Sequence, residues 1–144
     1  MKLVLDTNQL TEHFFDGAKL LGIMAPLKDY QFCWHVNNWL GIDFRINNEI
    51  EIQLTRKGRN YFFSVFEWAE PSNCLMHYLY NNQHMGEYLL PEMKHFDFLW
   101  LMKDDYVDDE TLLQLIKSIR EMQGVQMVAE LTNVKIKNKE HLVF

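Results

Sequence analysis

The chain has 144 residues, of which 14 are basic and 20 acidic, giving a net charge of -6. Hydrophobic residues make up 48% and aromatic residues 14%, with only 6 Gly and 3 Pro, so the composition excludes collagen-like, low-complexity and wholly disordered chains. The negative charge argues against polyanionic partners such as DNA and anionic membranes. The length suits one core rather than two, and we expect a single folded domain over residues 1–144.

Sequence features that mark a compartment indicate a cytoplasmic protein. Charged or amide residues interrupt every apolar run before it reaches the roughly 18 residues of a membrane-spanning helix, so no membrane partner is expected. The short apolar run of residues 1–5 is cut by Asp6, which indicates a strand rather than a signal peptide. Cys33 and Cys74 lie far apart, and we interpret both as small buried hydrophobic residues rather than as a disulfide or zinc ligands.

The first forty residues predict strands and one helix. Residues 2–6 indicate a strand, and residues 19–25 indicate either a strand or a helical turn. A helix is expected over 26–40, because Pro26 suits its first turn and Gly41 its end. Its apolar face is predicted to hold Leu27, Tyr30, Cys33 or Trp34, Asn37 and Leu40.

The middle of the chain predicts antiparallel strands joined by short turns. Residues 49–55 alternate between apolar and polar side chains, residues 56–60 supply a turn, and 61–68 and 74–80 form further strands. One predicted face of 61–68 carries Tyr61, Phe63 and Val65, and the other carries Phe62, Phe66 and Trp68. Both faces therefore need cover, and any part left exposed would form an interface with another protein.

The last third predicts a central strand and the strongest helix of the chain. Residues 96–102 are apolar on nearly both faces, as in a strand covered above and below. Asp108 is a suitable N-cap, and Gly124 marks the stop that precedes a final strand over 125–130. The predicted apolar stripe of this helix is Leu112, Leu115, Ile116, Ile119 and Met122. The fold class is therefore α+β, an antiparallel or mixed sheet with two helices packed on it as a two-layer sandwich.

The segment over residues 90–98 resembles the signature of the IPExxxVDY family, a group of small, uncharacterised bacterial proteins. Pro91, Glu92 and Asp97 match the signature. The departures are Leu90 for Ile, Phe96 for Val and Phe98 for Tyr, of which the first two keep an apolar side chain and the third removes a hydroxyl.

The resemblance to this family extends over most of the chain. The family's N-terminal strand looks like residues 2–5 here, its Leu-Lys-Asp-Tyr segment and Cys-Trp pair look like residues 27–30 and 33–34, and its Gly-Val segment looks like residues 124–125. No activity is established for the family. The resemblance implies a bacterial cytoplasmic setting and no mechanism.

The sharpest candidate for a chemical site is a polar cluster of His77, Glu92, His95 and Asp97. In a continuous strand His95 and Asp97 would share one face, and His77 from a neighbouring strand would complete a metal or acid/base site. The alternative is structural: Glu92 caps a turn after Pro91, and Asp97 accepts backbone hydrogen bonds. We favour this alternative, and we expect neither a metal nor a cofactor.

One basic and aromatic cluster indicates a possible RNA contact. Arg56, Lys57 and Arg59 lie at the predicted turn before 61–68, and basic residues beside aromatic rings can hold single-stranded RNA. The competing interpretation is that these rings pack in the core while the basic side chains stay solvated.

The leading functional hypothesis is a non-catalytic protein-interaction or self-associating module, with a protein partner or a second copy as the occupant. It rests on the aromatic excess and on the absence of nucleotide-binding, nucleophile-elbow and metalloprotease motifs. The first alternative is a small-molecule-binding protein or enzyme using residues 92–97, with an unknown ligand, and the second is RNA binding through residues 56–63.

Overall fold

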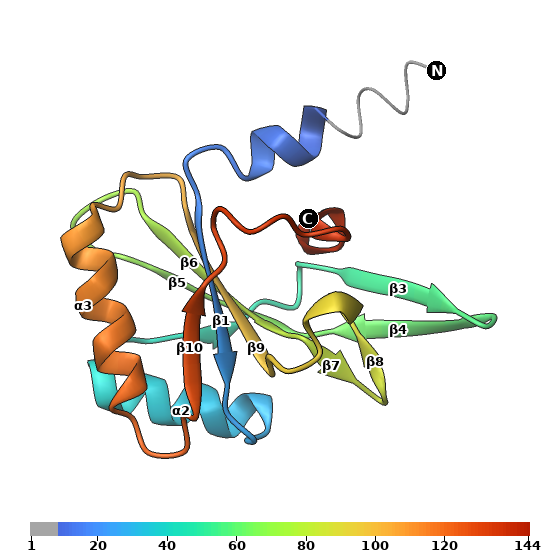
Figure 1. Ribbon diagram of the computed structural model, residues 1–144, viewed down its shortest axis with the longest axis horizontal. Coiled ribbons are helices and arrows are strands. Elements are labelled where there is room, and N and C mark those ends of the chain that lie inside the picture. Colours follow the sequence, from blue (N-terminus) through green and yellow to red (C-terminus); the bar gives the residue numbers. More distant parts are fainter. Residues whose placement is uncertain (1–8) are drawn as a thin grey trace.

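The computed structural model describes residues 9–144 and builds them around a six-stranded sheet of order β10-β1-β9-β6-β5-β2, in which every neighbouring pair is antiparallel (Figure 1). Its strands are β1 (Lys19–Met24), β2 (Arg45–Ile46), β5 (Val65–Ala69), β6 (Met76–Asn81), β9 (Phe98–Lys103) and β10 (Met127–Glu130). The expected α+β class is confirmed.

Two hairpins and five helical segments complete the described chain. The hairpins pair β3 (Ile52–Arg56) with β4 (Arg59–Phe63) and β7 (Gln83–His84) with β8 (Glu87–Tyr88). The helices are α2 (Asp29–Leu40) and α3 (Asp109–Arg120), the 3-10 helices are η1 (Pro91–Met93) and η2 (Lys139–Leu142), and residues 9–14 are helical. Within residues 9–144 no helix has both the length and the apolar character to cross a membrane.

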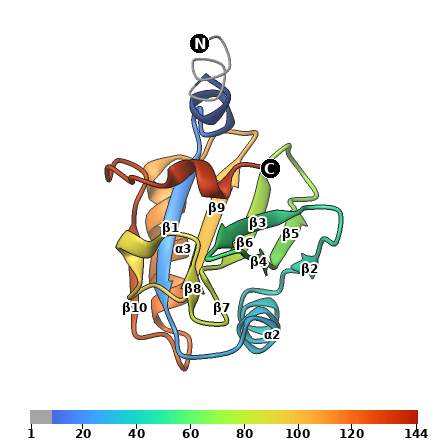
Figure 2. The ribbon, with the colours of Figure 1, turned by 90° about the vertical axis from the view of Figure 1, so that its right-hand side faces the viewer.

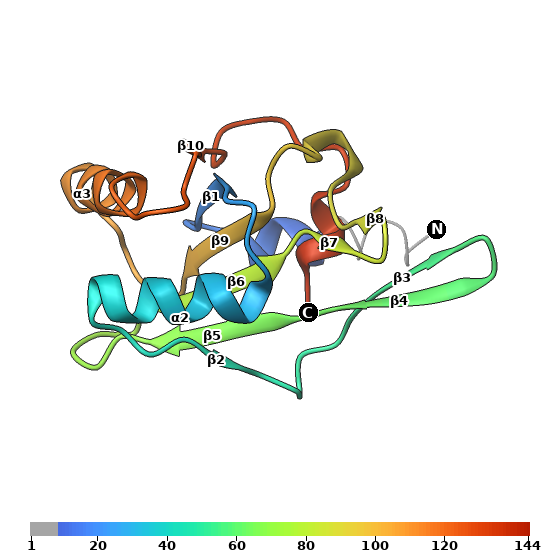
Figure 3. The ribbon, with the colours of Figure 1, turned by 90° about the horizontal axis from the view of Figure 1, so that it is seen from below.

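Helices α2 and α3 cover one face of the sheet, as predicted (Figures 1 and 3). The ring of Phe32 on α2 stacks on Phe98 of β9 with centroids 4.4 Å apart. On α3, Asp108 accepts a hydrogen bond from the Thr111 N–H at 2.7 Å and so caps the helix, as expected. The buried residues on this face come from both helices and from the sheet: Leu21, Ile23, Val36, Leu79, Trp100, Leu112, Ile116, Ile119 and Val128.

The other face of the sheet is covered by shorter pieces rather than by a helical layer. The β3–β4 hairpin lies on the side opposite α3 (Figure 2). Its buried residues join those of the helical residues 9–14, the 90–96 connection and the C-terminal segment in a second core: Phe14, Leu54, Tyr80, Leu90, Phe96, Leu99, Leu131 and Leu142. The expected two layers therefore gain a third, irregular one.

Strand β9 is the central strand that its composition predicted. Its side chains alternate between the two cores, with Trp100 on the helix side and Leu99 and Leu101 on the other, and all three are fully buried. The strand begins at Phe98, however, not at residue 96. Phe96 therefore packs in the second core while Phe98 packs in the first, so the two rings do not share one face as they would in a continuous strand.

The predicted strand over 61–68 is two strands that meet at Ser64. The chain leaves the small hairpin at Phe63 and enters the large sheet at Val65, because β5 pairs with β2 and β6 rather than with β3. Most aromatic side chains of residues 61–68 are covered by the two cores. Within this segment Phe62 is the exception, since it lies on the outer face of the hairpin and is 53% exposed.

The helix predicted over 26–40 begins at Asp29, and its buried face is only partly the predicted one. Cys33 is buried and Leu40 packs against the core as expected, whereas Tyr30 and Trp34 point to solvent. Phe32 and Val36, which were not predicted, point into the core. The stacking of Phe32 on the sheet sets this rotation.

Three remaining expectations concern single segments. The run over 19–25 is a strand, β1. Cys33 is buried as expected, but Cys74 is exposed, because it lies in the turn that joins β5 to β6. The predicted strand over 2–6 lies outside the described residues.

Candidate functional site

The structure does not bring the predicted polar cluster together. His77 lies opposite Met102 on β9, whereas Asp97 precedes Phe98, which lies opposite Asn81. Four residues lie between Asp97 and Met102, so the two positions are five steps, or roughly 16 Å, apart along the strand direction. Within residues 9–144 no group of three or more His, Cys, Asp and Glu side chains is arranged to hold a metal ion.

Glu92 and Asp97 instead tie distant segments to the 90–97 connection. Glu92 accepts hydrogen bonds from the backbone N–H and the side-chain amide of Asn138, at 2.8 and 3.1 Å. Burial raises the pKa of Glu92, but these and other hydrogen bonds outweigh it and hold the pKa below its ordinary value. Asp97 accepts from the Ala25 N–H at 2.8 Å, and because burial outweighs that bond, its pKa lies above its ordinary value.

Asn82 organises the same connection and was missed as a structural residue by the sequence analysis. Its side chain is fully buried and makes three hydrogen bonds, accepting from the Leu90 N–H at 2.9 Å and donating to the carbonyls of Phe96 and Met93 at 2.8 and 3.1 Å. No feature of the sequence indicates this role, because an Asn after a strand is equally typical of a solvated turn.

Three hydrogen-bonded side chains, Trp100, His77 and Glu70, lie at one end of the helix-covered face, with Trp100 and His77 buried and Glu70 partly exposed. The Trp100 indole N–H donates to His77 Nδ1 at 3.0 Å, so the neutral imidazole carries its proton on Nε2 and donates it to Glu70 at 2.7 Å. Burial lowers the pKa of His77, and the neighbouring Glu70 only partly offsets this. Both ring nitrogens are occupied, which disfavours a role in proton transfer.

Next to these three side chains, a half-enclosed cavity of about 230 Å³ opens between the two helices and the sheet. Its walls are mostly apolar, with Leu40 from α2, Leu115 from α3 and Trp68 and Trp100 from the sheet. Glu70 and His77 provide its polar side. The register of the β5–β6 hairpin places Trp68 opposite His77 and leaves Glu70 in the connecting turn.

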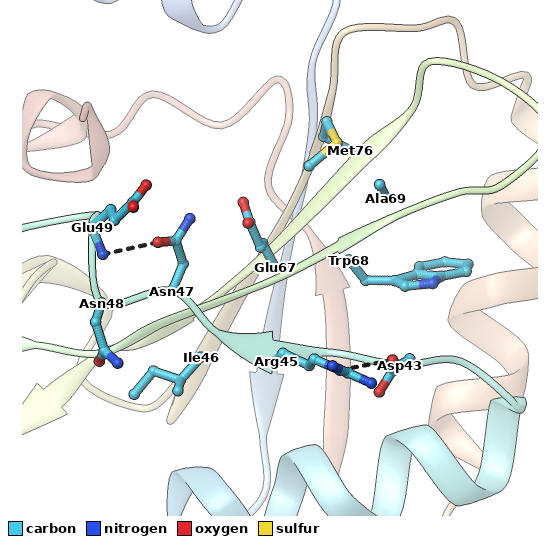
Figure 4. Close-up of a pocket in the computed structure, with 10 residues that line it drawn as sticks. All are labelled: Asp43, Arg45, Ile46, Asn47, Asn48, Glu49, Glu67, Trp68, Ala69 and Met76. Atoms are coloured by element: carbon cyan, nitrogen blue, oxygen red, sulfur yellow. Dashed lines mark hydrogen bonds and ion pairs between the residues drawn. The ribbon is translucent and has the colours of Figure 1, made fainter.

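A second hollow, at the β2 edge, is larger but open. It measures about 620 Å³ and runs along polar side chains of the 43–49 segment and β5 (Figure 4). Arg45 is paired with Asp43 at 2.9 Å and lies at the register position opposite Glu67. These charges are solvated and partnered, so a ligand here would gain little from them.

The basic residues proposed for RNA contact lie at the tip of the β3–β4 hairpin, which projects from the body (Figure 3). Arg56 and Arg59 lie opposite each other across a two-residue turn, on the face that also carries Tyr61. The exposed Phe62 points to the other face. The hairpin therefore separates its basic side chains from its most exposed ring.

The outer face of α2 carries the most exposed aromatic pair on a helix in the described chain. Tyr30 and Trp34 lie one turn apart and are 60% and 63% exposed. The ring of Trp34 contacts His35 edge to face at 5.2 Å, and the Asn38 amide donates to the Trp34 carbonyl at 2.8 Å. We refer to Tyr30 and Trp34 below as the α2 aromatic pair.

Comparison with known proteins adds no functional assignment. A scan against models of protein families finds none that matches the chain, and a search of curated proteins finds no match.

Proposed function

We propose that the protein is a non-catalytic protein-interaction module that docks through the outer face of α2. The observation that carries this proposal is the α2 aromatic pair, in which Tyr30 and Trp34 are each more than half exposed on one side of a regular helix. Large aromatic side chains that desolvate on binding supply much of the energy of protein interfaces.

The surroundings of the pair support docking on a protein surface. The buried side of α2 is fixed on the sheet by Phe32 and Val36, so the helix presents the pair rigidly. Lys28 and Asp29, of opposite charge, lie at the start of the helix and would form a polar rim. A second copy of the chain is the first occupant to test, and the bacterial cytoplasm implied by the family resemblance is the proposed setting.

The alternatives have less support. Glu92 and Asp97 are engaged by Asn138 and Ala25, so the 92–97 segment has structural partners for both carboxylates. For RNA, the tip of the β3–β4 hairpin offers cations without an exposed ring on the same face, as described above.

The test is the molar mass in solution by light scattering over a concentration series. We expect the wild-type protein to associate as its concentration rises and the double variant Tyr30→Ala/Trp34→Ala to remain monomeric. The matched control is Tyr106→Ala, which removes an aromatic ring that is 81% exposed outside α2. Association that persists unchanged in the double variant contradicts the proposal.

A second arm covers a different protein partner. A photo-crosslinking amino acid at position 34 is irradiated in a lysate of the source cells, with the same group at position 106 as the control. A discrete protein adduct at position 34 alone supports docking through α2. A wild-type protein that is monomeric at every concentration and forms no such adduct contradicts it.

A further inference from the structure

We propose that the cavity between α2, α3 and the sheet is a binding site for a small organic amine, a cationic nitrogen attached to an aromatic or branched apolar body. This site is separate from the outer face of α2, and it depends on Glu70, His77 and the two tryptophans rather than on Tyr30 and Trp34.

The size of the cavity limits the ligand. An apolar cavity of about 150 Å³ accepts benzene, and this one has a volume of about 230 Å³. It therefore fits one ring with a short chain. Its walls of Leu40, Val107, Leu115 and tryptophan rings favour an apolar body, whose transfer from water is favourable.

The charge of the lining selects an amine over an acid. Glu70 is the single charged residue among the described residues that line the cavity, and no Lys or Arg does. Its two oxygens accept from Asn73 at 2.9 Å and from His77 at 2.7 Å. A carboxylate has about four acceptor sites, so Glu70 can still receive an ammonium N–H.

Two further features support a cationic head group. Burial raises the pKa of Glu70, but the hydrogen bonds from His77 and Asn73 outweigh it and keep the pKa below its ordinary value, so the carboxylate stays ionised at neutral pH. Trp68 and Trp100 line the same cavity, and a cation that lies over an indole face is attracted to it.

His77 acts as a positioning residue for this site. Because Trp100 donates to Nδ1, Nε2 carries the proton and points at Glu70. The imidazole therefore holds the carboxylate in one orientation without contributing a charge of its own.

The experiment uses three probes of one shape and different charge: 2-phenylethylamine, 2-phenylethanol and 3-phenylpropionate. Each is titrated into the full-length protein at neutral pH, and the indole N–H resonances of the tryptophans are followed by NMR. We expect the amine to bind with a Kd below about 1 mM, the alcohol to bind about tenfold more weakly, and the acid not to bind. The shifted resonance should be that of Trp100, identified with Trp100→Phe.

Three variants separate charge from shape. Glu70→Gln should remove the preference for amine over alcohol. Leu115→Trp should fill the cavity and abolish binding of both. The matched control Glu67→Gln removes a carboxylate from the opposite face of β5 and should leave all affinities unchanged.

The proposal is overturned if the wild-type protein binds none of the probes, if the acid binds as well as the amine, or if the shifts fall on Trp34 and Trp39 alone. Because these outcomes concern the wild-type protein, they hold even where a variant fails to fold. Loss of association in Tyr30→Ala/Trp34→Ala has no bearing on them, so the two proposals fail separately.

Discussion

The side chain of Asn82 replaces the backbone partners that the chain loses where β6 ends. Beyond Asn81 the sheet stops, and Leu90, Met93 and Phe96 have backbone groups inside the second core. The amide of Asn82 offers one acceptor and two donors, which is the set that these groups require. A single side chain thereby holds a connection that has little regular structure.

Replacing Asn82 with Ala should lower the free energy of unfolding by about 2–4 kcal/mol, because buried backbone groups would lose their partners. Urea unfolding at neutral pH measures the change. Asn81→Ala is the matched control, since Asn81 is only partly buried, and it should cost clearly less. Equal effects at the two positions would show that the amide network of Asn82 contributes little.

The buried His77 predicts a pH dependence of stability. Burial places its folded pKa below the ordinary value of 6.5, so the unfolded chain binds more protons once the pH falls to that value. Stability that His77 contributes is therefore present above about pH 6.5 and is lost as the pH falls below it. The lowered pKa of Glu70 acts in the same direction at more acidic pH.

Urea unfolding between about pH 5 and 8 tests this prediction around the ordinary pKa of histidine. The wild-type protein should gain stability as the pH rises, and His77→Gln should show a smaller gain, because the substitution removes the titrating ring but keeps hydrogen-bonding groups. His35→Gln on the exposed side of α2 should follow the wild-type curve. A gain that survives intact in His77→Gln would assign the pH dependence to other groups.

At the scale of elements, the sequence predicts best those helices and strands whose ends and buried faces are set by residues within the element itself. Helix α3 was predicted well, because Asp108 caps it and its apolar residues form a single stripe. Helix α2 was not, because Tyr30, Phe32 and Trp34 offer two competing apolar faces and only contact with β9 decides between them. The break at Ser64 likewise depends on which sheet each half joins.

Gly22 in strand β1 allows a test of how tightly this strand packs against the second core. A Cβ at Gly22 would lie 2.8 Å from the ring of Phe96 and 2.9 Å from Leu131, so Gly22→Ala should destabilise the protein by about 1–3 kcal/mol through overpacking. Thermal and urea unfolding measure it. The double variant Gly22→Ala/Phe96→Leu should recover part of the loss, whereas additive losses would contradict the packing argument.

At the scale of the whole molecule, the two cores depend on pairings between distant segments. Strand β1 lies between β9 and β10, and the Tyr80 hydroxyl donates to the Leu142 carbonyl at 2.8 Å. The sequence predicted antiparallel strands but not their order, because apolar alternation does not specify partners. The cavity beside Glu70 could not be predicted for the same reason, since it forms where α2, α3 and the sheet meet.

The C-terminal segment should therefore stabilise the whole domain. Leu142 is fully buried in the second core, and Leu142→Ala should lower the free energy of unfolding by about 2–4 kcal/mol in one cooperative transition. Val143→Ala is the control, because Val143 is only partly buried. If the substitution disturbs only the C-terminal segment and leaves the free energy of global unfolding unchanged, the segment is an independent appendage.

The placement of β1 between β9 and β10 has a consequence for biosynthesis. Leu21 pairs with Trp100 and Glu130, so at translation rates of about 5–20 residues per second its strand waits roughly 5 to 20 seconds for its last partner to be made. During that time we expect the apolar residues Leu20, Leu21 and Ile23 of β1 to be accessible to chaperones. Codon changes that slow translation between residues 25 and 130 should therefore increase chaperone association of the nascent chain.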